Sequence, residues 1–253
     1  MTVLETIAVA FSMYSAIPVP QFKWTERNMR YALCAFPLIG LITGLLCWAV
    51  WALMHALGIP SVFCAALMCA VPVIITGGIH LDGYADTCDA LASHADREKK
   101  LEILSDPHIG SFAVIRICCH FVIMFAAWAA LKEFDPLPFI VSFCLSRTLS
   151  ALAVCAFPKA KKKGLAYTFS QAVQQKKITR ILTVMDIALS AVMCITGLIG
   201  LFMALAAHAV FVYYYFMSKR VFGGITGDLA GWFLVQAEKW MLAAAVVFGF
   251  ILS

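Results

Sequence analysis

The sequence contains few charged residues. Asp, Glu, Lys and Arg make up 13% of its 253 residues, half the share of about 25% that is usual in soluble domains. The ten cysteines form no Cys-x-x-Cys pair, and no basic stretch is interleaved with aromatic residues, as it would be in a nucleic-acid-binding protein. The first twenty residues lack Lys and Arg, so they lack the basic start of a signal peptide. These absences exclude a soluble domain, a disulfide or zinc scaffold and a nucleic-acid-binding protein.

Apolar length, by contrast, is abundant. Hydrophobic residues make up 63% of the chain, and its recurring apolar runs are long enough to cross a hydrocarbon core of about 30 Å. We therefore predict an all-α fold, a polytopic integral membrane helical bundle that forms one membrane domain over residues 1–253. About seven transmembrane helices follow an N-terminal interfacial segment at 1–30. The predicted spans are Tyr31–Leu57, Ser61–Ile79, Ile109–Leu131, Pro138–Phe157, Ile181–Gly200, Leu201–Met217 and Leu229–Leu252.

Two local patterns refine this prediction. The fifth and sixth spans form one apolar tract from Ile181 to Met217, which is too long for a single crossing, so we divide it near Gly197-Leu-Ile-Gly200. In the first span, Gly40 and Gly44 are four residues apart. They present a face of small residues, which favours close packing against another helix.

The predicted loops differ strongly in cationic charge. Fifteen Lys and Arg residues fall on one side of the membrane, against Lys132 alone on the other. Because cytoplasmic loops carry an excess of Lys and Arg, we predict a cytoplasmic N-terminus, an acidic cytoplasmic active-site loop at 80–108 and a basic cytoplasmic loop at 158–180. The C-terminus is then outside. The fifteen residues are Lys23, Arg27, Arg30, Arg97, Lys99, Lys100, Lys159, Lys161, Lys162, Lys163, Lys176, Lys177, Arg180, Lys219 and Arg220.

The acidic residues are concentrated in one stretch. Half of the fourteen lie between residues 82 and 106. Among them, Asp82, Asp86 and Asp89 are spaced i, i+4 and i+7, so they would share one face of a helix. Three like charges on one face repel one another and need a counter-ion, and Mg²⁺ held by carboxylates and substrate phosphates would supply it. The alternative is a solvated loop face beside the membrane.

A short pattern occurs twice. Gly77-Gly-Ile-His-Leu-Asp82 is repeated in outline as Gly223-Gly-Ile-Thr-Gly-Asp228, and both copies end an apolar segment on the predicted cytoplasmic side. Gly-Gly permits unusual backbone geometry, so each Asp can reach a shared metal ion or phosphate. A third acidic junction, Asp106-Pro-His-Ile-Gly-Ser111, opens the third span, where a helix N-terminus can bind an anion. We expect the three junctions to meet on one membrane surface.

Charged residues within the predicted spans are costly in a bilayer. Arg116 lies seven residues into the third span, about 10 Å deep at about 1.5 Å per residue. Arg147 lies near the middle of the fourth span. Both are candidates for substrate binding or catalysis. The alternative is structural pairing, of Arg147 with Glu238 and of Arg116 with Asp186.

The motifs together resemble one family. The sequence Gly77-Gly-Ile-His-Leu-Asp-Gly-Tyr-Ala-Asp86, followed by Asp89, resembles the signature of the cobalamin synthase family, the adenosylcobinamide-GDP ribazoletransferases. The matches cover nearly the whole chain in the family's order. Four further segments resemble motifs of the same family: Ile17-Pro-Val-Pro20, Asp106-Pro-His-Ile-Gly-Ser-Phe112, Ser146-Arg147 and Gly223-Gly-Ile-Thr-Gly-Asp228.

The resemblance implies a transferase of cobalamin biosynthesis. Such an enzyme joins adenosylcobinamide-GDP to α-ribazole or α-ribazole 5′-phosphate, uses Mg²⁺ and releases GMP. The resemblance also implies that the protein lies in a bacterial or archaeal cytoplasmic (inner) membrane, in contact with membrane lipid. A homo-oligomer is a further expectation. The candidate roles are metal binding by Asp82, Asp86 and Asp228, catalysis by Asp89, His80 and Arg147, and substrate binding by Gly77, Gly78, Asp106, His108, Ser111, Arg116, Gly223, Gly224 and Thr226.

Two other functions stay open at this point. A CDP-alcohol phosphatidyltransferase-like enzyme also attacks a nucleotide diphosphate with a helical Asp cluster, but its pattern needs an Arg that Ala85-Asp86 does not supply. A secondary transporter also has broken helices and intramembrane charges. Most carboxylates here, however, lie in surface junctions rather than near the midplane of the membrane.

Overall fold

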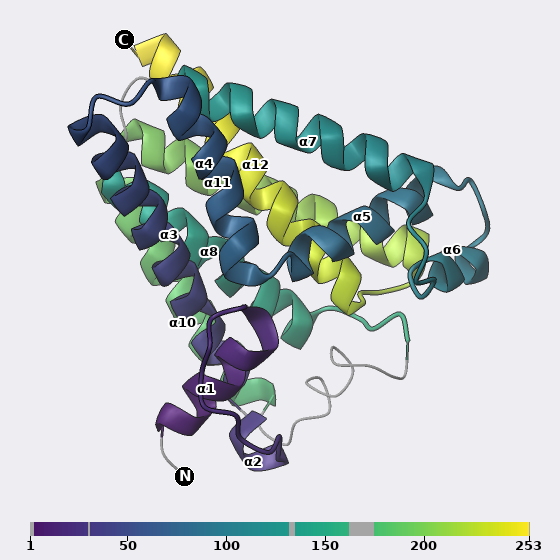
Figure 1. Ribbon diagram of the computed structural model, residues 1–253. Coiled ribbons are helices and arrows are strands. Elements are labelled where there is room, and N and C mark those ends of the chain that lie inside the picture. The colour runs from purple at the N-terminus through teal and green to yellow at the C-terminus, as the bar shows by residue number, and fades with distance from the viewer. Residues whose placement is uncertain (1–2, 30, 132–134, 162–174, 253) are drawn as a thin grey trace.

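The computed structural model describes residues 3–29, 31–131, 135–161 and 175–252. Six of its helices are long and apolar enough to cross a membrane, and a seventh crossing would be formed by α4 and α5, which meet at a bend of 98°. The predicted all-α polytopic bundle is confirmed (Figure 1). The helices are α1 (Val3–Tyr14), α2 (Glu26–Met29), α3 (Ala32–Ala56), α4 (Ser61–Thr76), α5 (Ile79–Ala92), α6 (Arg97–Ile103), α7 (Ser111–Ala130), α8 (Pro136–Ala156), α10 (Gln175–Ile195), α11 (Leu198–Met217), the π-helical turn η1 (Ser218–Phe222) and α12 (Gly227–Leu252).

The predicted spans match most of these helices closely. The ends of α3, α7, α8 and α12 all lie within about two residues of the predicted ends. α10 starts at Gln175, well before the predicted Ile181, because its first turn is polar and extends the helix beyond the apolar tract. The break before α11 falls at Gly197, whose φ of 110° favours glycine. The predicted division of the tract is therefore placed at the first of its two glycines.

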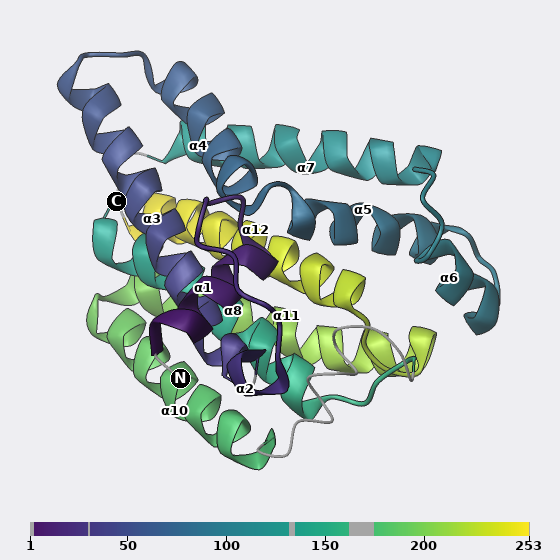
Figure 2. The ribbon, with the colours of Figure 1, turned by 60° about the horizontal axis from the view of Figure 1, so that its bottom comes forward.

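The predicted second span is broken at its end. α4 stops at Thr76, and Gly77 and Gly78 follow with φ values of 64° and 80°, in the left-handed region that glycine adopts without strain. The chain turns there and continues as α5, beside α7 and α12 (Figure 2). The stretch named an acidic loop at 80–108 thus contains α5 and α6.

α8 is the central helix of the bundle. Within its membrane-spanning window 83% of the residues are buried, and α3, α10, α11 and α12 pack around it. On α3, Gly40 faces the backbone of Phe143, and a Cβ on Gly44 would lie 2.7 Å from the Cα of Ile140. The predicted small-residue face is therefore the surface on which α3 approaches α8.

An ion pair connects α8 to α12 inside the bundle. Arg147 is fully buried, and its guanidinium donates a hydrogen bond to the carboxylate of Glu238. The hydroxyl of Ser146 also donates to Glu238, at 3.0 Å. The predicted structural pairing of Arg147 with Glu238 is confirmed.

The other predicted pairing, of Arg116 with Asp186, is wrong. Arg116 lies on α7 and Asp186 on α10, and these helices lie on opposite sides of the bundle (Figure 2). Asp186 instead lies 3.2 Å from Nε2 of His208 on the neighbouring α11. Arg116 lies within electrostatic range of Lys239 on α12.

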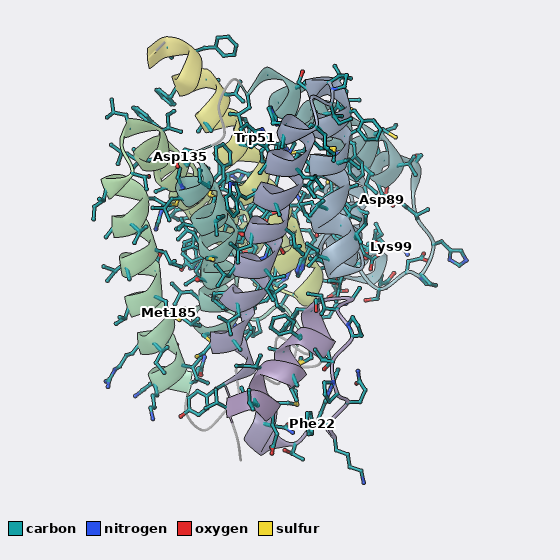
Figure 3. All side chains as sticks on the ribbon, turned by 60° about the vertical axis from the view of Figure 1, so that its left-hand side comes forward. Phe22, Trp51, Asp89, Lys99, Asp135 and Met185 are labelled. Carbon is teal, nitrogen blue, oxygen red and sulfur yellow. The ribbon has the colours of Figure 1, made fainter. Side chains whose placement is uncertain are left out.

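The two ends of the bundle carry different segments. The N-terminus lies at one end and the C-terminus at the other (Figure 1). Phe22 lies at the N-terminal end, whereas Asp135 lies toward the opposite end (Figure 3). Much of the predicted basic loop, at 162–174, lies outside the described residues, as do Arg30 and Lys132.

We expect the buried ion pair of Arg147 and Glu238 to contribute to stability, so that substituting either residue alone is more damaging than substituting both. Arg147→Met alone should lower the free energy of unfolding by about 3–5 kcal/mol, because Glu238 would stay buried without its cation. Glu238→Leu alone should do the same, and the double variant should recover most of the loss. Thermal unfolding in detergent measures this. Losses that simply add in the double variant would contradict the pairing.

Candidate active site

The two helices that follow the repeated motif, α5 and α12, cross at two glycines. A Cβ on Gly83 would lie 2.7 Å from the carbonyl oxygen of Asp228, closer than real Cβ atoms come. A Cβ on Gly231 would lie 3.0 Å from the carbonyl oxygen of His80. The backbones approach this closely because neither glycine has a side chain. The crossing therefore brings Asp82, the neighbour of Gly83, beside Asp228.

The carboxylates of the two motifs form one cluster. Asp86 lies within electrostatic range of Asp82, Asp89 and Asp228, and Asp228 lies within range of Asp82. Asp82 is exposed, whereas Asp86, Asp89 and Asp228 are half-buried. In the part of the chain that the structure describes, these four acids form no ion pair. Their negative charges are therefore left for a bound cation to neutralise.

The cluster fits a magnesium ion that is shared with a substrate. Within the described ranges, no three His, Cys, Asp or Glu side chains are arranged to hold a metal ion by themselves. Mg²⁺ keeps several waters and is commonly bound by one or two carboxylates together with substrate phosphates. The oxygen donors of Asp82, Asp86 and Asp228 suit such a site, which phosphate oxygens would complete.

Both copies of the repeated motif turn the chain at a Gly-Gly pair that precedes a helix. Gly223 and Gly224 have φ values of 76° and 154°, so a glycine elbow precedes α12 as Gly77 and Gly78 precede α5. Asp82 and Asp228 then lie in the first turn of their helices. The positive end of each helix dipole favours an acidic side chain or an anion there.

Backbone contacts from distant segments hold the second elbow. The amide of Ile225 donates to the carbonyl of Pro158 at 2.8 Å, and Ile225 accepts from Ala160 at 3.0 Å. Arg97 of α6 donates to the carbonyl of Phe222 at 2.8 Å, and its guanidinium occupies the space where Gly223 has no Cβ. Gly223 and Gly224, predicted to bind substrate, therefore have a structural function that is visible here.

Thr226 organises the start of α12. Its hydroxyl accepts a hydrogen bond from the amide of Leu229 at 3.3 Å and donates to Oδ2 of Asp228 at 3.2 Å. The threonine thus caps the helix and also orients the acid. Asp228 is free of the capping role, which supports a function for its charge.

One lysine of the basic stretch lies close to the cluster. Lys161 is within electrostatic range of Asp228 and donates to the carbonyl of Leu101 at 2.9 Å. Burial lowers the pKa of Lys159 to about 8. In the sequence both lysines indicated only the orientation of the loop, and nothing in the spacing of Lys161 indicated that it lies near Asp228.

The third junction divides into two parts. The carboxylate of Asp89 lies against Gly110, directly before Ser111, the exposed first residue of α7. Asp106 and His108 instead pair with each other in an exposed loop, where Nδ1 of His108 lies 2.7 Å from Oδ1 of Asp106. The backbone N–H of His108 is the main reason that the pKa of Asp106 is lowered. Only Asp89 joins this junction to the carboxylate cluster.

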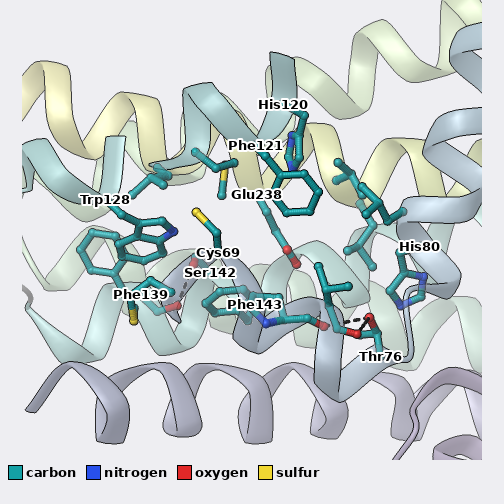
Figure 4. Close-up of a pocket in the computed structure, with 18 of the residues that line it drawn as sticks. Cys69, Thr76, His80, His120, Phe121, Trp128, Phe139, Ser142, Phe143 and Glu238 are labelled. Atoms are coloured by element: carbon teal, nitrogen blue, oxygen red, sulfur yellow. Dashed lines mark hydrogen bonds between the residues drawn. The ribbon is translucent and has the colours of Figure 1, made fainter. Parts of the chain in front are cut away.

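Arg147 lines an interior cavity of about 60 Å³. Glu238 points into it between Phe121 and Phe143, and His80 lies at its edge (Figure 4). Because the guanidinium of Arg147 is already paired with Glu238, this geometry favours the structural role over the predicted catalytic one.

His80 lies between two cavities. Besides the interior cavity it lines a second one, of about 210 Å³, whose lining also includes Asp82 and Asp228. The second cavity is enclosed by α1, α3, α5, α8 and α12. Arg116, predicted to bind substrate, lines neither cavity and is exposed on α7.

A comparison with protein families accounts for this arrangement of motifs. Residues 6–246 match the family model described as cobalamin-5-phosphate synthase. The chain belongs to this family. The match covers both glycine elbows and all four acids of the cluster, and it confirms the family that the motifs resembled. It decides against the phosphatidyltransferase and transporter alternatives.

Curated relatives agree over nearly the full length of the chain. A protein of Lachnoclostridium phytofermentans is 40% identical over 245 residues, 96% of this chain and 94% of its own. A Clostridium botulinum protein is 32% identical, over 96% of this chain and 97% of its own. A Pseudomonas fluorescens protein is 31% identical, over 95% and 98%. All three are named adenosylcobinamide-GDP ribazoletransferase. No solved structure matches the chain.

The glycine crossing can be tested with one pair of substitutions. Gly83→Ala should lower the free energy of unfolding by about 1–3 kcal/mol, since the new methyl group forces α5 and α12 apart. Gly227→Ala is the matched control, because a Cβ there meets nothing within 4 Å. Thermal unfolding in detergent compares the two variants. Equal stability of both would show that the crossing tolerates a side chain.

Proposed function

We propose that this protein is a Mg²⁺-dependent adenosylcobinamide-GDP ribazoletransferase. It joins adenosylcobinamide-GDP to α-ribazole or α-ribazole 5′-phosphate, yielding adenosylcobalamin or its 5′-phosphate together with GMP. One observation carries the proposal. The two Gly-Gly-Ile motifs bring Asp82 and Asp228 together in the lining of one cavity, with Asp86 within electrostatic range of both, in a chain that its family matches over residues 6–246.

The reaction is a substitution at phosphorus. A ribose hydroxyl of the acceptor attacks the phosphorus next to cobinamide, a new P–O bond forms, and the bond to the GMP oxygen breaks. Asp82, Asp86 and Asp228 would hold the metal ion. When bound, Mg²⁺ supplies positive charge that neutralises the diphosphate and the departing phosphate.

Other residues near the cluster bind and position the substrates. Lys161, beside Asp228, offers a cation for the nucleotide phosphates. Asp89 was predicted to be catalytic, as the base that takes the hydroxyl proton or as a group that orients a ligand. Its contact with Gly110 favours a positioning role, in which it fixes the start of α7 and the free N–H groups at Ser111.

We further propose that the protein lies in a bacterial inner membrane and that its carboxylate cluster is on the cytoplasmic side. The support is the bias of fifteen Lys and Arg residues against one, together with the cytoplasmic supply of nucleotide-activated substrates. Membrane lipid then surrounds the apolar outer face. The homo-oligomer expected from the sequence stays a prediction.

A washed-membrane assay tests the activity. Membranes containing the protein should release GMP from adenosylcobinamide-GDP only when α-ribazole or its 5′-phosphate and Mg²⁺ are present. Release of CMP from a CDP-alcohol, or no release of either nucleotide, would overturn the proposal.

We expect Asp82 and Asp228 to act as one unit. Asp82→Asn and Asp228→Asn should each lower kcat/KM on the order of 100-fold and raise the Mg²⁺ concentration needed for half-maximal rate, because each removes a charged ligand. The double variant should lose far less than the product of the two single losses. Glu98→Gln, on the exposed face of α6, is the matched control. A near-normal rate and Mg²⁺ dependence for Asp228→Asn would contradict the shared site.

Orientation can be measured with an impermeant thiol reagent. On a background from which the ten native cysteines have been removed, Asp96→Cys should react only when the cytoplasmic side is open, and Asp135→Cys should react in intact cells. The reason is the cationic bias between the two sides. Reaction of position 96 in intact cells would reverse the proposed topology.

A further inference from the structure

The cavity beside the carboxylates has an aromatic and apolar wall. Tyr14 of α1, Leu33 and Phe36 of α3 and Val154 of α8 line it. The rings of Tyr14 and Phe36 lie 4.6 Å apart between centroids, and those of Phe36 and His80 lie 5.6 Å apart. The wall is therefore a continuous row of rings that leads from the N-terminal helix toward Asp82 and Asp228.

One buried nitrogen in this wall has no partner among the described residues. Nε2 of His80 makes no hydrogen bond there, although the residue is only 8% exposed. Ser150, also in the lining, already donates to the carbonyl of Ala230 at 3.4 Å. Buried polar atoms are nearly always hydrogen-bonded, so a ligand that accepts a hydrogen bond from this imidazole would satisfy it.

The N-terminal segment closes the cavity. The amide of Ala16 donates to the carbonyl of Ile75 at 2.8 Å, and Gly77 leaves room for the side chain of Ala16. These contacts fasten the end of α1 to the elbow between α4 and α5. Tyr14 is thereby held against Phe36. The segment Ile17–Pro20, for which the sequence predicted no role, comes directly after Ala16.

We propose that this cavity binds the aromatic base of the acceptor nucleoside and presents its ribose hydroxyl to the carboxylates. The inference rests on the proposed function, since it assigns a subsite to one of the two substrates. The base of α-ribazole is a dimethylated benzimidazole, flat and apolar, with one ring nitrogen left as an acceptor. Stacking on the ring row and one hydrogen bond from Nε2–H of His80 would satisfy it.

The competing occupant is the guanine of adenosylcobinamide-GDP. Guanine also stacks, but its edge carries several donors and acceptors. The part of the lining formed by Leu33, Phe36 and Val154 offers these groups no partner, and burying them against it is costly. The apolar wall therefore favours the benzimidazole base over guanine, and steady-state kinetics separate the two.

The test uses the full-length protein in lipid vesicles with each substrate varied in turn. Tyr14→Ala should raise KM for α-ribazole about tenfold, the order expected for one lost stacked ring, and leave KM for adenosylcobinamide-GDP within about twofold. Tyr14→Phe keeps the ring and should show a much smaller rise. Phe22→Ala is the matched control, because this exposed aromatic side chain of the same segment does not line the cavity.

A second variant and a binding measurement keep the outcomes distinct. Val154→Phe fills the cavity from α8 and should raise the same KM. A rise in KM for adenosylcobinamide-GDP instead, or no change in either KM, overturns the inference. Calorimetric binding of α-ribazole alone, weakened by Tyr14→Ala but not by Phe22→Ala, tests the subsite without turnover. Unmodified protein that binds α-ribazole but releases no GMP would overturn the proposed function and support the subsite.

Discussion

The close crossing of α5 and α12 is the constraint on which the site depends. Gly83 and Gly231 allow two backbones to touch, so acids from chain segments far apart in the sequence share one small volume. With larger residues at these positions, a layer of side chains would hold α5 and α12 apart, and Asp82 and Asp228 would be separated with them. The same helix crossing forms part of the wall of the cavity beside the carboxylates, because His80 and Gly231 are in contact and both line that cavity. The close contact at Gly83 and Gly231 thus determines both how α5 and α12 pack and where Asp82 and Asp228 lie.

The sequence predicts those features whose causes are local. Apolar length predicts the spans, and paired glycines predict the breaks at Gly77 and Gly223, since only glycine adopts positive φ freely. The spacing of Asp82, Asp86 and Asp89 predicts a common helix face because it depends on helical geometry alone. These predictions need no knowledge of which helices are neighbours.

The features that the sequence did not predict depend on neighbours. Arg97 reaches the carbonyl of Phe222 from 125 residues away, and Tyr14 meets Phe36 only because α1 folds back on α3. The two proposed ion pairs show the same limit. Both had suitable charges, but only Arg147 and Glu238 lie on helices that pack together. Opposite charge within a membrane is therefore insufficient evidence of contact until the helix order is known.

The buried pair between α8 and α12 has a consequence for how the protein is made. Arg147 and Glu238 are 91 residues apart in the chain, and α12 is synthesised after α8. During synthesis α8 must wait in or near the membrane with its guanidinium uncompensated, at a cost that intramembrane charges always carry. Arrival of α12 neutralises that charge, and the same helix brings Asp228 to the site. Insertion of α12 and assembly of the acidic cluster are therefore one event in biogenesis, and a chain terminated before α12 would lack both the ion pair and the cluster.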